Sequence, residues 1–195
     1  MPSDLRTAAT PGRLLAISGS LRAASHCTAV LRHVGTMLPA GVTQQVFTLG
    51  QVPPYNGDLD GATPPAPVAE LKEAIAQADG LVICSPEYNY GIPGVLKNAI
   101  DWASRPGFAS PLKGKPALVS TASPGALGGV RAQAQIRDAL AATLARPLSR
   151  PHVAVPLIAT RFQDGRLVDT TTLEMLQAAI GDLLSEIRQL VAARG

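Results

Sequence analysis

Short apolar runs alternate with longer amphipathic segments along this chain, a pattern typical of strands that alternate with helices. Runs such as RLLAIS and GLVIC are bounded by turn residues and are too short for buried helices, so they indicate buried strands. Between them, apolar residues recur every three or four positions, which indicates helices. The pattern predicts strands at 13–18, 43–49, 80–84, 115–121 and 152–155. It predicts helices at 25–38, 68–78, 92–103, 129–144 and 172–193.

This alternation predicts an α/β fold in which a parallel sheet of five strands is covered by helices on both faces. We expect one domain over residues 13–195, preceded by a loose tail at 1–12. Segment 51–67 holds five prolines and is longer than a plain connector, so it is either a binding loop or lid, or a flexible loop. Parallel sheets bind ligands beyond the carboxyl ends of their strands. The segments to examine are therefore 19–25, 85–92 and 122–128.

The composition excludes several classes of protein. The chain has 195 residues, of which 16% are charged and 46% hydrophobic, so it is not a charge-rich disordered chain. The formal net charge of +3 comes from scattered basic residues, which gives little support to nucleic-acid binding. We find no secretory signal, no apolar run long enough to span a membrane, and no metal-ligand spacing of cysteine and histidine. We therefore expect a soluble cytoplasmic protein with reduced thiols, no metal site, and neither nucleic acid nor membrane as partner.

The segment after the first predicted strand, SGSLRAAS, is rich in groups that bind anions. It places hydroxyls at Ser18, Ser20 and Ser25 and a guanidinium at Arg22 beside a predicted helix start, where backbone N–H groups are free. The segment matches neither GxGxxG nor the P-loop, which disfavours dinucleotide and ATP sites of those types. It fits a monophosphate held mainly by hydroxyls. The alternative is a serine-rich turn in which Ser25 caps the helix.

The segment after the third predicted strand, SPEYNYGIPG, concentrates aromatic residues. Tyr88, Tyr90 and nearby Trp102 are three of the seven aromatic residues in the chain. Prolines and glycines around them would aim the backbone N–H and C=O groups, as a flat heterocycle requires. The alternative is a turn whose tyrosines pack beneath the following helix.

The segment after the fourth predicted strand, ASPGALGG, is rich in glycine. Gly125, Gly128 and Gly129 permit a close approach of the backbone or a positive φ. An ordinary flexible turn is the alternative.

Together, GSLRAAS, SPEYNYGIPGVLKNAIDWASRP and SPGALGGVRAQAQIRDAL resemble the NADPH-dependent FMN reductase family, which includes flavodoxin-like quinone, chromate and azo-compound reductases. The resemblance covers about residues 13–160. It implies a flavodoxin-like fold with a five-stranded parallel sheet and bound FMN. It assigns the FMN phosphate to the first segment, the isoalloxazine ring to the second and a close approach to the third. The implied cofactor contacts are Ser18, Ser20, Arg22, Ser25, Cys27, Pro86, Glu87, Tyr88, Asn89, Tyr90, Ser123 and Gly125.

Cys27 departs from the family pattern, which often has asparagine at this place. A thiol is a poorer hydrogen-bond donor than an amide, so we expect weaker FMN binding or a larger share for the backbone. The first turn of a helix can lower the pKa of a thiol, which raises a redox hypothesis for Cys27. Its neighbour His26 would add a phosphate contact if protonated, or would simply be solvated. Cys84 ends a buried strand and is expected in the core.

The resemblance implies an oxidoreductase that transfers hydride from NADPH or NADH through FMN to a quinone, flavin, azo or metal-oxyanion acceptor by a ping-pong mechanism. No protein side chain is expected to be catalytic. The helix starting near Pro93 is a candidate to stabilise negative charge on the reduced ring. Arg22, Arg105 and Arg131 are candidates for a 2′-phosphate contact. A homodimer or homotetramer is implied, with the predicted helix 129–144 and segment 51–67 as contacts.

Three other functions stay open at this point. An electron-carrier flavodoxin would bind FMN without a substrate of its own, although such carriers tend to be acidic and this chain is basic. A hydrolase is disfavoured because GxSxG is absent. A regulator that senses a phosphorylated metabolite would be colourless after purification.

Overall fold

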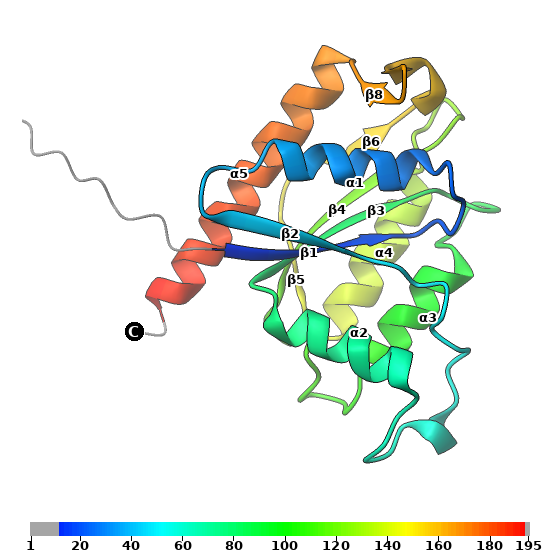
Figure 1. Ribbon diagram of the computed structural model, residues 1–195, viewed down its shortest axis with the longest axis vertical. Coiled ribbons are helices and arrows are strands. Elements are labelled where there is room, and N and C mark those ends of the chain that lie inside the picture. Colours follow the sequence, from blue (N-terminus) through cyan, green and yellow to red (C-terminus); the bar gives the residue numbers. More distant parts are fainter. Residues whose placement is uncertain (1–11, 194–195) are drawn as a thin grey trace, which may run out of the picture.

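A computed structural model of the protein describes residues 12–193 (Figure 1). The parallel strands are β1 (Gly12–Ser18), β2 (Val42–Phe47), β3 (Gly80–Ser85), β4 (Pro116–Ala122), β5 (Arg146–Pro147) and β6 (Val153–Val155). The α-helices are α1 (His26–Thr36), α2 (Ala66–Gln77), α3 (Gly94–Ala103), α4 (Val130–Ala142) and α5 (Thr170–Ala192). Two 3₁₀ turns, η1 (Gly57–Leu59) and η2 (Ile158–Arg161), and a hairpin of β7 (Phe162–Gln163) with β8 (Arg166–Leu167) complete the described chain.

The sheet confirms the predicted flavodoxin-like fold, with the strand order β2-β1-β3-β4-β5. The chain reverses its direction across the sheet between β1 and β3, so the segments that follow these two strands lie beside each other. The fifth position differs from the prediction because two short strands share it. β5 pairs with the start of β4, and β6 pairs with its end. Pro147 lies in β5, and Pro151 lies between β5 and β6. Proline has no N–H group to donate, which explains the interruption of the strand.

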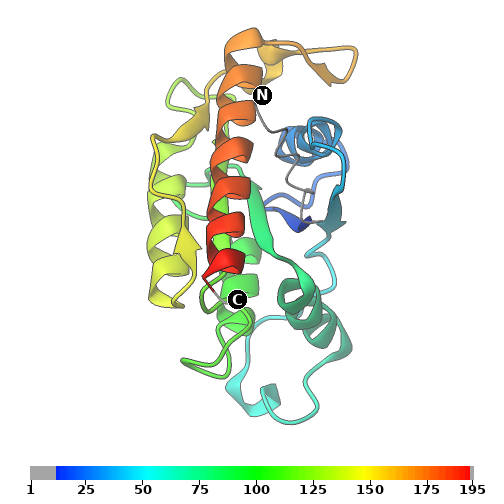
Figure 2. The same cartoon turned by 90° about the vertical axis from the view of Figure 1, so that its left-hand side faces the viewer.

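Helices cover both faces of the sheet, as predicted. Leu14 and Ala16 of β1 belong to the core on one face, together with buried residues of α1 and α5. Leu15 and Ile17 point to the other face, where α2, α3 and α4 supply the core (Figures 1 and 2). This alternation follows from the period of two in a strand, and the sheet is apolar on both sides because both sides are covered.

The predicted element boundaries are correct to within a few residues. Ser25 is the N-cap of α1, as expected, and its hydroxyl accepts the Thr28 N–H at 3.3 Å. The predicted tail 1–12 lies outside the described residues except for Gly12, which is the first residue of β1. Among residues 12–193, no helix is both long and apolar enough to cross a membrane.

The β7–β8 hairpin was missed by the sequence analysis. Asp164 and Gly165 form its turn with φ values of +49° and +74°. The dipeptide Asp-Gly is a strong signal for such a turn, so the sequence contained the information. The hairpin packs beside α1, where the ring of Phe162 lies 5.1 Å from that of His26.

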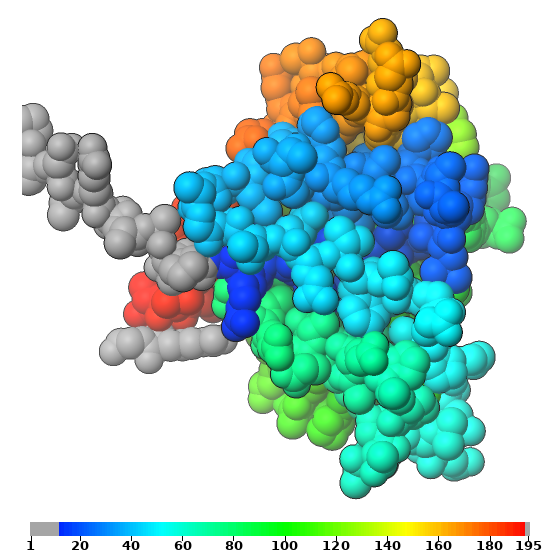
Figure 3. All heavy atoms as spheres, viewed as in Figure 1, coloured from blue at the N-terminus to red at the C-terminus, as the bar shows by residue number. Residues whose placement is uncertain are grey.

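Segment 51–67 is tied to α3. The Pro53 carbonyl accepts hydrogen bonds from Asn98 Nδ2 and Trp102 Nε1, each at 2.8 Å. The Tyr55 N–H donates to Asn98 Oδ1 at 2.7 Å, and the rings of Tyr55 and Trp102 meet edge to face at 4.9 Å. Figure 3 shows this segment in cyan on the surface of the molecule. Trp102 is completely buried, so it anchors the segment and does not join Tyr88 and Tyr90 as a ligand-facing aromatic residue.

The chain packs closely around Gly128, in the loop between β4 and α4. Its φ is +62°, and an added Cβ would lie 2.9 Å from the Ala154 carbonyl carbon and 3.0 Å from Pro156 N. Gly165 has a similar φ of +74° with nothing within 4 Å. Gly165→Ala should therefore cost about 1–2 kcal/mol of unfolding free energy, from backbone strain alone. Gly128→Ala should cost about 1–3 kcal/mol more, because β6 must shift. Urea unfolding measures both, and equal losses would contradict the packing argument.

Candidate functional site

Three loops leave the carboxyl ends of β1, β3 and β4: loop 1 (residues 19–25), loop 2 (residues 86–93) and loop 3 (residues 123–129). Loop 1 begins directly against the end of β3. The Gly19 N–H donates to the Cys84 carbonyl at 2.9 Å, and a Cβ on Gly19 would lie only 2.3 Å from Ser85 Oγ. Only glycine allows this approach, so the serine-rich loop and the tyrosine-rich loop are neighbours.

Loop 1 is organised around the Ser18 hydroxyl. Ser18 Oγ accepts from Thr28 Oγ1 at 2.9 Å and from the Ser20 N–H at 3.2 Å, and it donates to the Ser20 carbonyl. Ser20 Oγ in turn accepts the Arg22 N–H at 3.4 Å. These contacts and the Ser25 N–H, which donates to the Arg22 carbonyl at 3.1 Å, connect Ser18, Ser20 and Ser25 with the main chain of Arg22. Thr28 was missed, although its position three residues after the N-cap could have indicated it.

In this candidate anion site, backbone N–H groups are freer to bind a ligand than the serine hydroxyls are. Several N–H groups between residues 18 and 28 have no acceptor on another residue among the described residues 12–193. They belong to Leu21, Ala23, Ala24, His26 and Cys27. The first turn of α1 contains no acidic residue, so nothing there neutralises the positive end of the helix. These donors suit a phosphate monoester.

Loop 2 presents its tyrosines to the outside. The N–H and C=O groups of Tyr88 and Gly91 bond reciprocally at 3.0 and 3.1 Å, which closes a tight turn. The two central residues, Asn89 and Tyr90, have φ values of +50° and +64°. A positive φ is uncommon for residues other than glycine, although asparagine tolerates it better than most, and such residues are enriched at functional sites. Tyr88 is 48% exposed and Tyr90 70% exposed, which overturns the alternative that they pack beneath α3.

Glu87 connects loop 2 to α4. The N-cap of α4 is Gly129, which has no side chain to cap the helix. Glu87 Oε2 takes over this role across 44 and 45 residues of sequence, because it accepts the N–H groups of Arg131 at 3.0 Å and Ala132 at 3.1 Å. Glu87 Oε1 also lies 3.8 Å from the Arg131 guanidinium. The carboxylate is therefore occupied by α4. For a ligand at loop 2, Glu87 and half-buried Pro86 present their main-chain groups.

Loop 3 is fixed by the strand beside it. The Ser123 N–H donates to the Val155 carbonyl at 3.1 Å, and the Ser123 carbonyl accepts the Ile158 N–H at 3.0 Å. Ser123 Oγ accepts the Gly125 N–H at 3.1 Å, so this predicted pair forms a local turn. The positive φ expected in this loop occurs at Gly128 and Gly129.

Exposed apolar side chains surround the three loops. Leu21 in loop 1, Leu127 in loop 3 and Leu157 just before η2 are each about half exposed, and Tyr88 and Tyr90 of loop 2 are exposed as well. Apolar side chains gathered at one edge of a sheet favour a ligand with an apolar surface. The carboxyl edge therefore combines anion donors with apolar and aromatic surface.

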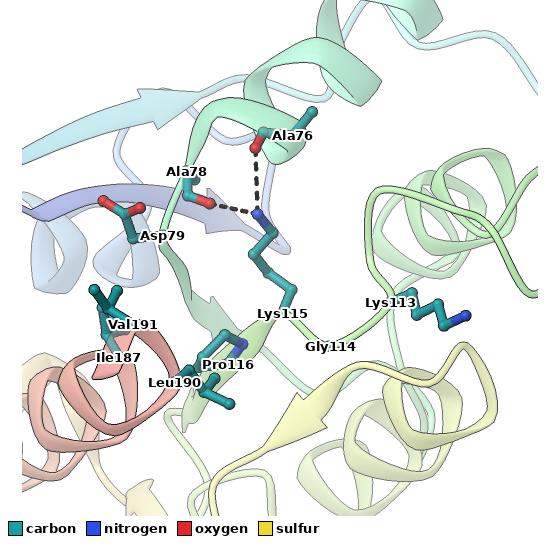
Figure 4. Close-up of a pocket in the computed structure, with 10 residues that line it drawn as sticks. All are labelled: Ala76, Ala78, Asp79, Lys113, Gly114, Lys115, Pro116, Ile187, Leu190 and Val191. Atoms are coloured by element: carbon teal, nitrogen blue, oxygen red, sulfur yellow. Dashed lines mark hydrogen bonds between the residues drawn. The ribbon is translucent and has the colours of Figure 1, made fainter. Parts of the chain in front are cut away.

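A small hollow of about 130 Å³ lies at the opposite edge of the sheet (Figure 4). Lys115 Nζ crosses it and donates to the carbonyls of Ala76 and Ala78 at the end of α2. A lysine in this position stabilises the negative end of a helix. Because the hollow lies where β3 and β4 begin, its lining is remote from loops 1–3 and has a structural role.

Comparison with known proteins identifies the family. The sequence model of the NADPH-dependent FMN reductases matches residues 13–160. The chain belongs to the NADPH-dependent FMN reductase family. It is 38% identical to an NAD(P)H-dependent FMN reductase of Pseudomonas aeruginosa over 91% of this chain and 96% of that protein. It is 36% identical to a quinone reductase of Escherichia coli, covering 90% of this chain and 97% of that protein.

The solved structures agree with this family. FerB, a flavoenzyme NAD(P)H:(acceptor) oxidoreductase from Paracoccus denitrificans, superposes with a TM-score of 0.83 at 31% identity. The match covers 91% of this chain and 98% of that chain. As a member of the FMN reductase family, the protein is an oxidoreductase that uses NAD(P)H and FMN. The unpaired donors of loop 1 fit the phosphate of FMN.

Cys27 differs from what we expected of this FMN reductase. Its side chain is buried, and Sγ donates to the Ala122 carbonyl at 3.9 Å. The adjacent Cys84 thiol and burial raise the pKa of Cys27 far above the ordinary value for a thiol. The redox hypothesis requires a lowered pKa, so the raised pKa contradicts it; the side chain points into the core and away from the helix start. Towards loop 1, Cys27 offers only its N–H group. Cys84 lies in the core as predicted.

Both thiols should resist modification in the folded protein. A raised pKa leaves little thiolate at Cys27, and thiolate is the reactive form. We expect a thiol reagent at pH 8 to modify an introduced Cys at exposed Ala109 quickly, and Cys27 and Cys84 only after unfolding in urea. Mass spectrometry of peptides locates the modified thiols. Modification of folded Cys27 as fast as the reference cysteine would restore the redox hypothesis.

The Glu87 cap should contribute measurably to stability. Glu87→Gln removes the charge from an acceptor that serves two N–H groups and a guanidinium. We expect a loss of about 1–2 kcal/mol in the free energy of unfolding in urea. Glu70→Gln, on an exposed part of α2, is the matched control and should stay within about 0.5 kcal/mol of the original protein. Equal effects of the two substitutions would contradict the remote cap.

Proposed function

We propose that the protein is an NAD(P)H:quinone oxidoreductase that holds FMN on loops 1–3. The observation that carries the proposal is the set of unpaired N–H groups in loop 1, directly beside the exposed aromatic turn of loop 2. The quinone reductases among the relatives support a quinone as the acceptor. Flavins, azo compounds and metal oxyanions are further acceptors in this proposal, because an exposed reductant discriminates little between them.

Each loop has its own task in this proposal. The phosphate is bound by Ser18, Ser20, Arg22 and Ser25 and by the free N–H groups of loop 1 and of the first turn of α1, including that of Cys27. Loop 2 lines the ring with Tyr88, Asn89 and Tyr90 and with the main chain of Pro86 and Glu87. Loop 3 approaches the ring with Ser123 and Gly125. FMN, when bound, supplies the redox chemistry, so none of these side chains is catalytic.

The start of α3 supports the same placement of the ring. Pro93 is the N-cap of α3 and has no side-chain hydrogen bond to the helix. The N–H groups of Gly94 and Val95 have no acceptor among the residues that the structure describes. They lie directly after loop 2 and bring the positive end of a helix to the site, where negative charge on a bound ring is stabilised.

A shared opening leads to a ping-pong mechanism. In this proposal one exposed face of the ring, beside Tyr88 and Tyr90, serves the dinucleotide first and the acceptor second, so the first must leave before the second binds. Steady-state rates at several acceptor concentrations should give parallel double-reciprocal lines. Intersecting lines would contradict the shared opening.

The homodimer or homotetramer and the cytoplasmic location stay predictions. A groove of about 320 Å³ between α3 and α4, flanked by strongly exposed Phe108 and by Leu144, supports α4 as a contact between copies. The elution volume of the purified protein in size-exclusion chromatography tests the assembly.

The visible spectrum tests the proposed function. We expect flavin absorption in the purified protein or after addition of FMN, bleaching by NADPH without oxygen, and recovery on addition of a quinone. A protein that binds no FMN would overturn the proposal. FMN that NADPH does not bleach would indicate an electron carrier.

A charge placed in loop 1 tests the location of the phosphate. Ala24 is exposed and its N–H is free, so Ala24→Asp puts a carboxylate where the phosphate binds. We expect FMN affinity to fall at least about tenfold and riboflavin affinity to stay the same, because riboflavin has no phosphate. Ala109→Asp, in an exposed loop elsewhere, is the control and should change neither affinity. An equal loss for FMN and riboflavin would move the phosphate away from loop 1.

A further inference from the structure

We propose that Arg131, stacked on Tyr90, binds a phosphate group of the nicotinamide dinucleotide. This inference rests on the proposed function and assigns a specificity residue to it. The phosphate is either the 2′-phosphate of NADPH or the pyrophosphate that NADPH and NADH share, and the experiment below separates the two.

The Arg131 guanidinium is held in place but remains accessible. Its central carbon lies 4.4 Å from the centre of the Tyr90 ring, and one nitrogen lies 3.8 Å from Glu87 Oε1. The side chain is nevertheless 49% exposed. A guanidinium that stacks through its face keeps N–H groups at its edge, and two of these can bind one phosphate together.

The charge of Arg131 is only partly balanced by Glu87. The Glu87 carboxylate is 12% exposed and already accepts the N–H groups of Arg131 and Ala132 at the start of α4. Its negative charge is therefore shared with the positive end of a helix. The guanidinium keeps an outward positive field beside loop 2, where an anionic substrate must approach.

Tyr90 is fixed as a platform for this guanidinium. Gln135 of α4 binds loop 2 within the turn and directly after it: it donates to the Tyr90 carbonyl at 3.4 Å and accepts the Ile92 N–H at 2.9 Å. These contacts hold Tyr90 in the left-handed region with its ring in solvent. Tyr90 is exposed, has a strained backbone and is held by Gln135 of α4. These features favour a binding role over simple packing.

The other two candidate arginines are placed less well for the dinucleotide. Arg22 lies in loop 1 with the proposed FMN phosphate. Arg105 also lies over a tyrosine, 5.8 Å from the centre of the Tyr55 ring, but beyond the last residue of α3. The ten residues of α3 separate it from loop 2 by about 15 Å of helix. Arg105 and Tyr55 are therefore a matched pair for a control.

Rapid mixing of the FMN-loaded protein with NADPH or NADH tests the inference. For Arg131→Gln we expect at least about a tenfold rise in the dinucleotide concentration that gives half the maximal rate of FMN bleaching. The maximal rate, FMN affinity and the KM for quinone should stay unchanged. Arg131→Lys should recover part of the affinity, because it keeps the charge and loses the paired geometry. Arg105→Gln should behave like the original protein.

Equilibrium binding gives a second readout that does not depend on turnover. Calorimetric titration with NADP⁺ and NAD⁺ should show the same loss of affinity in Arg131→Gln. A loss for NADP⁺ alone assigns the 2′-phosphate, and an equal loss for both assigns the pyrophosphate.

Two results would overturn the inference while the proposed function stands. One is normal bleaching by both dinucleotides in Arg131→Gln with unchanged NADP⁺ and NAD⁺ affinities. The other is a loss of FMN affinity as large as the loss of dinucleotide affinity, which would make Arg131 part of the loop scaffold. Failure of NADPH to bleach the original protein would instead remove the proposed function itself.

Discussion

The close approach of Gly19 to Ser85 is the constraint on which the candidate site depends. The chain reverses across the sheet between β1 and β3, and the carboxyl ends of these strands can meet only if loop 1 turns without a side chain. The hydrogen bond from the Gly19 N–H to the Cys84 carbonyl fixes that turn. Loop 1 with its anion donors and loop 2 with its tyrosines thereby share one edge. A ligand with a phosphate at one end and a flat ring at the other fits this arrangement.

Long-range ties then hold the other loops against this edge. Glu87 caps α4 from loop 2, Gln135 of α4 holds the turn of loop 2, and Ser123 joins loop 3 to β6. These contacts offset the strain of two consecutive left-handed residues, Asn89 and Tyr90. Because the loops are tied to helices and strands, the site is organised before a ligand binds, and less ordering is needed on binding. The same ties place Arg131 beside the opening.

Local patterns allowed the sequence to predict most of the fold, and long-range contacts account for what it did not predict. The apolar runs and the Ser25 cap are local, and they located the helices and four of the strand positions well. The split between β5 and β6 arises from prolines whose effect depends on the neighbouring strand. Trp102 is close to loop 2 in the sequence, but its indole N–H donates to the Pro53 carbonyl in a distant segment. The capping role of Glu87 depends on a glycine at the start of α4, which no local pattern in loop 2 reveals.

The position of Cys27 shows which part of loop 1 matters for an anion. Resemblance to the family implied that a thiol in place of an amide would weaken FMN binding or leave a larger share of it to the backbone. In the structure this thiol lies in the core against Cys84 and Ala122, whereas the N–H of the same residue belongs to the first turn of α1 and has no acceptor on another described residue. The hydroxyls of Ser18, Ser20 and Thr28 are largely engaged with one another and with the backbone. The positive helix end and its free N–H groups are therefore the main attraction for a phosphate, and these do not depend on the side chain at position 27.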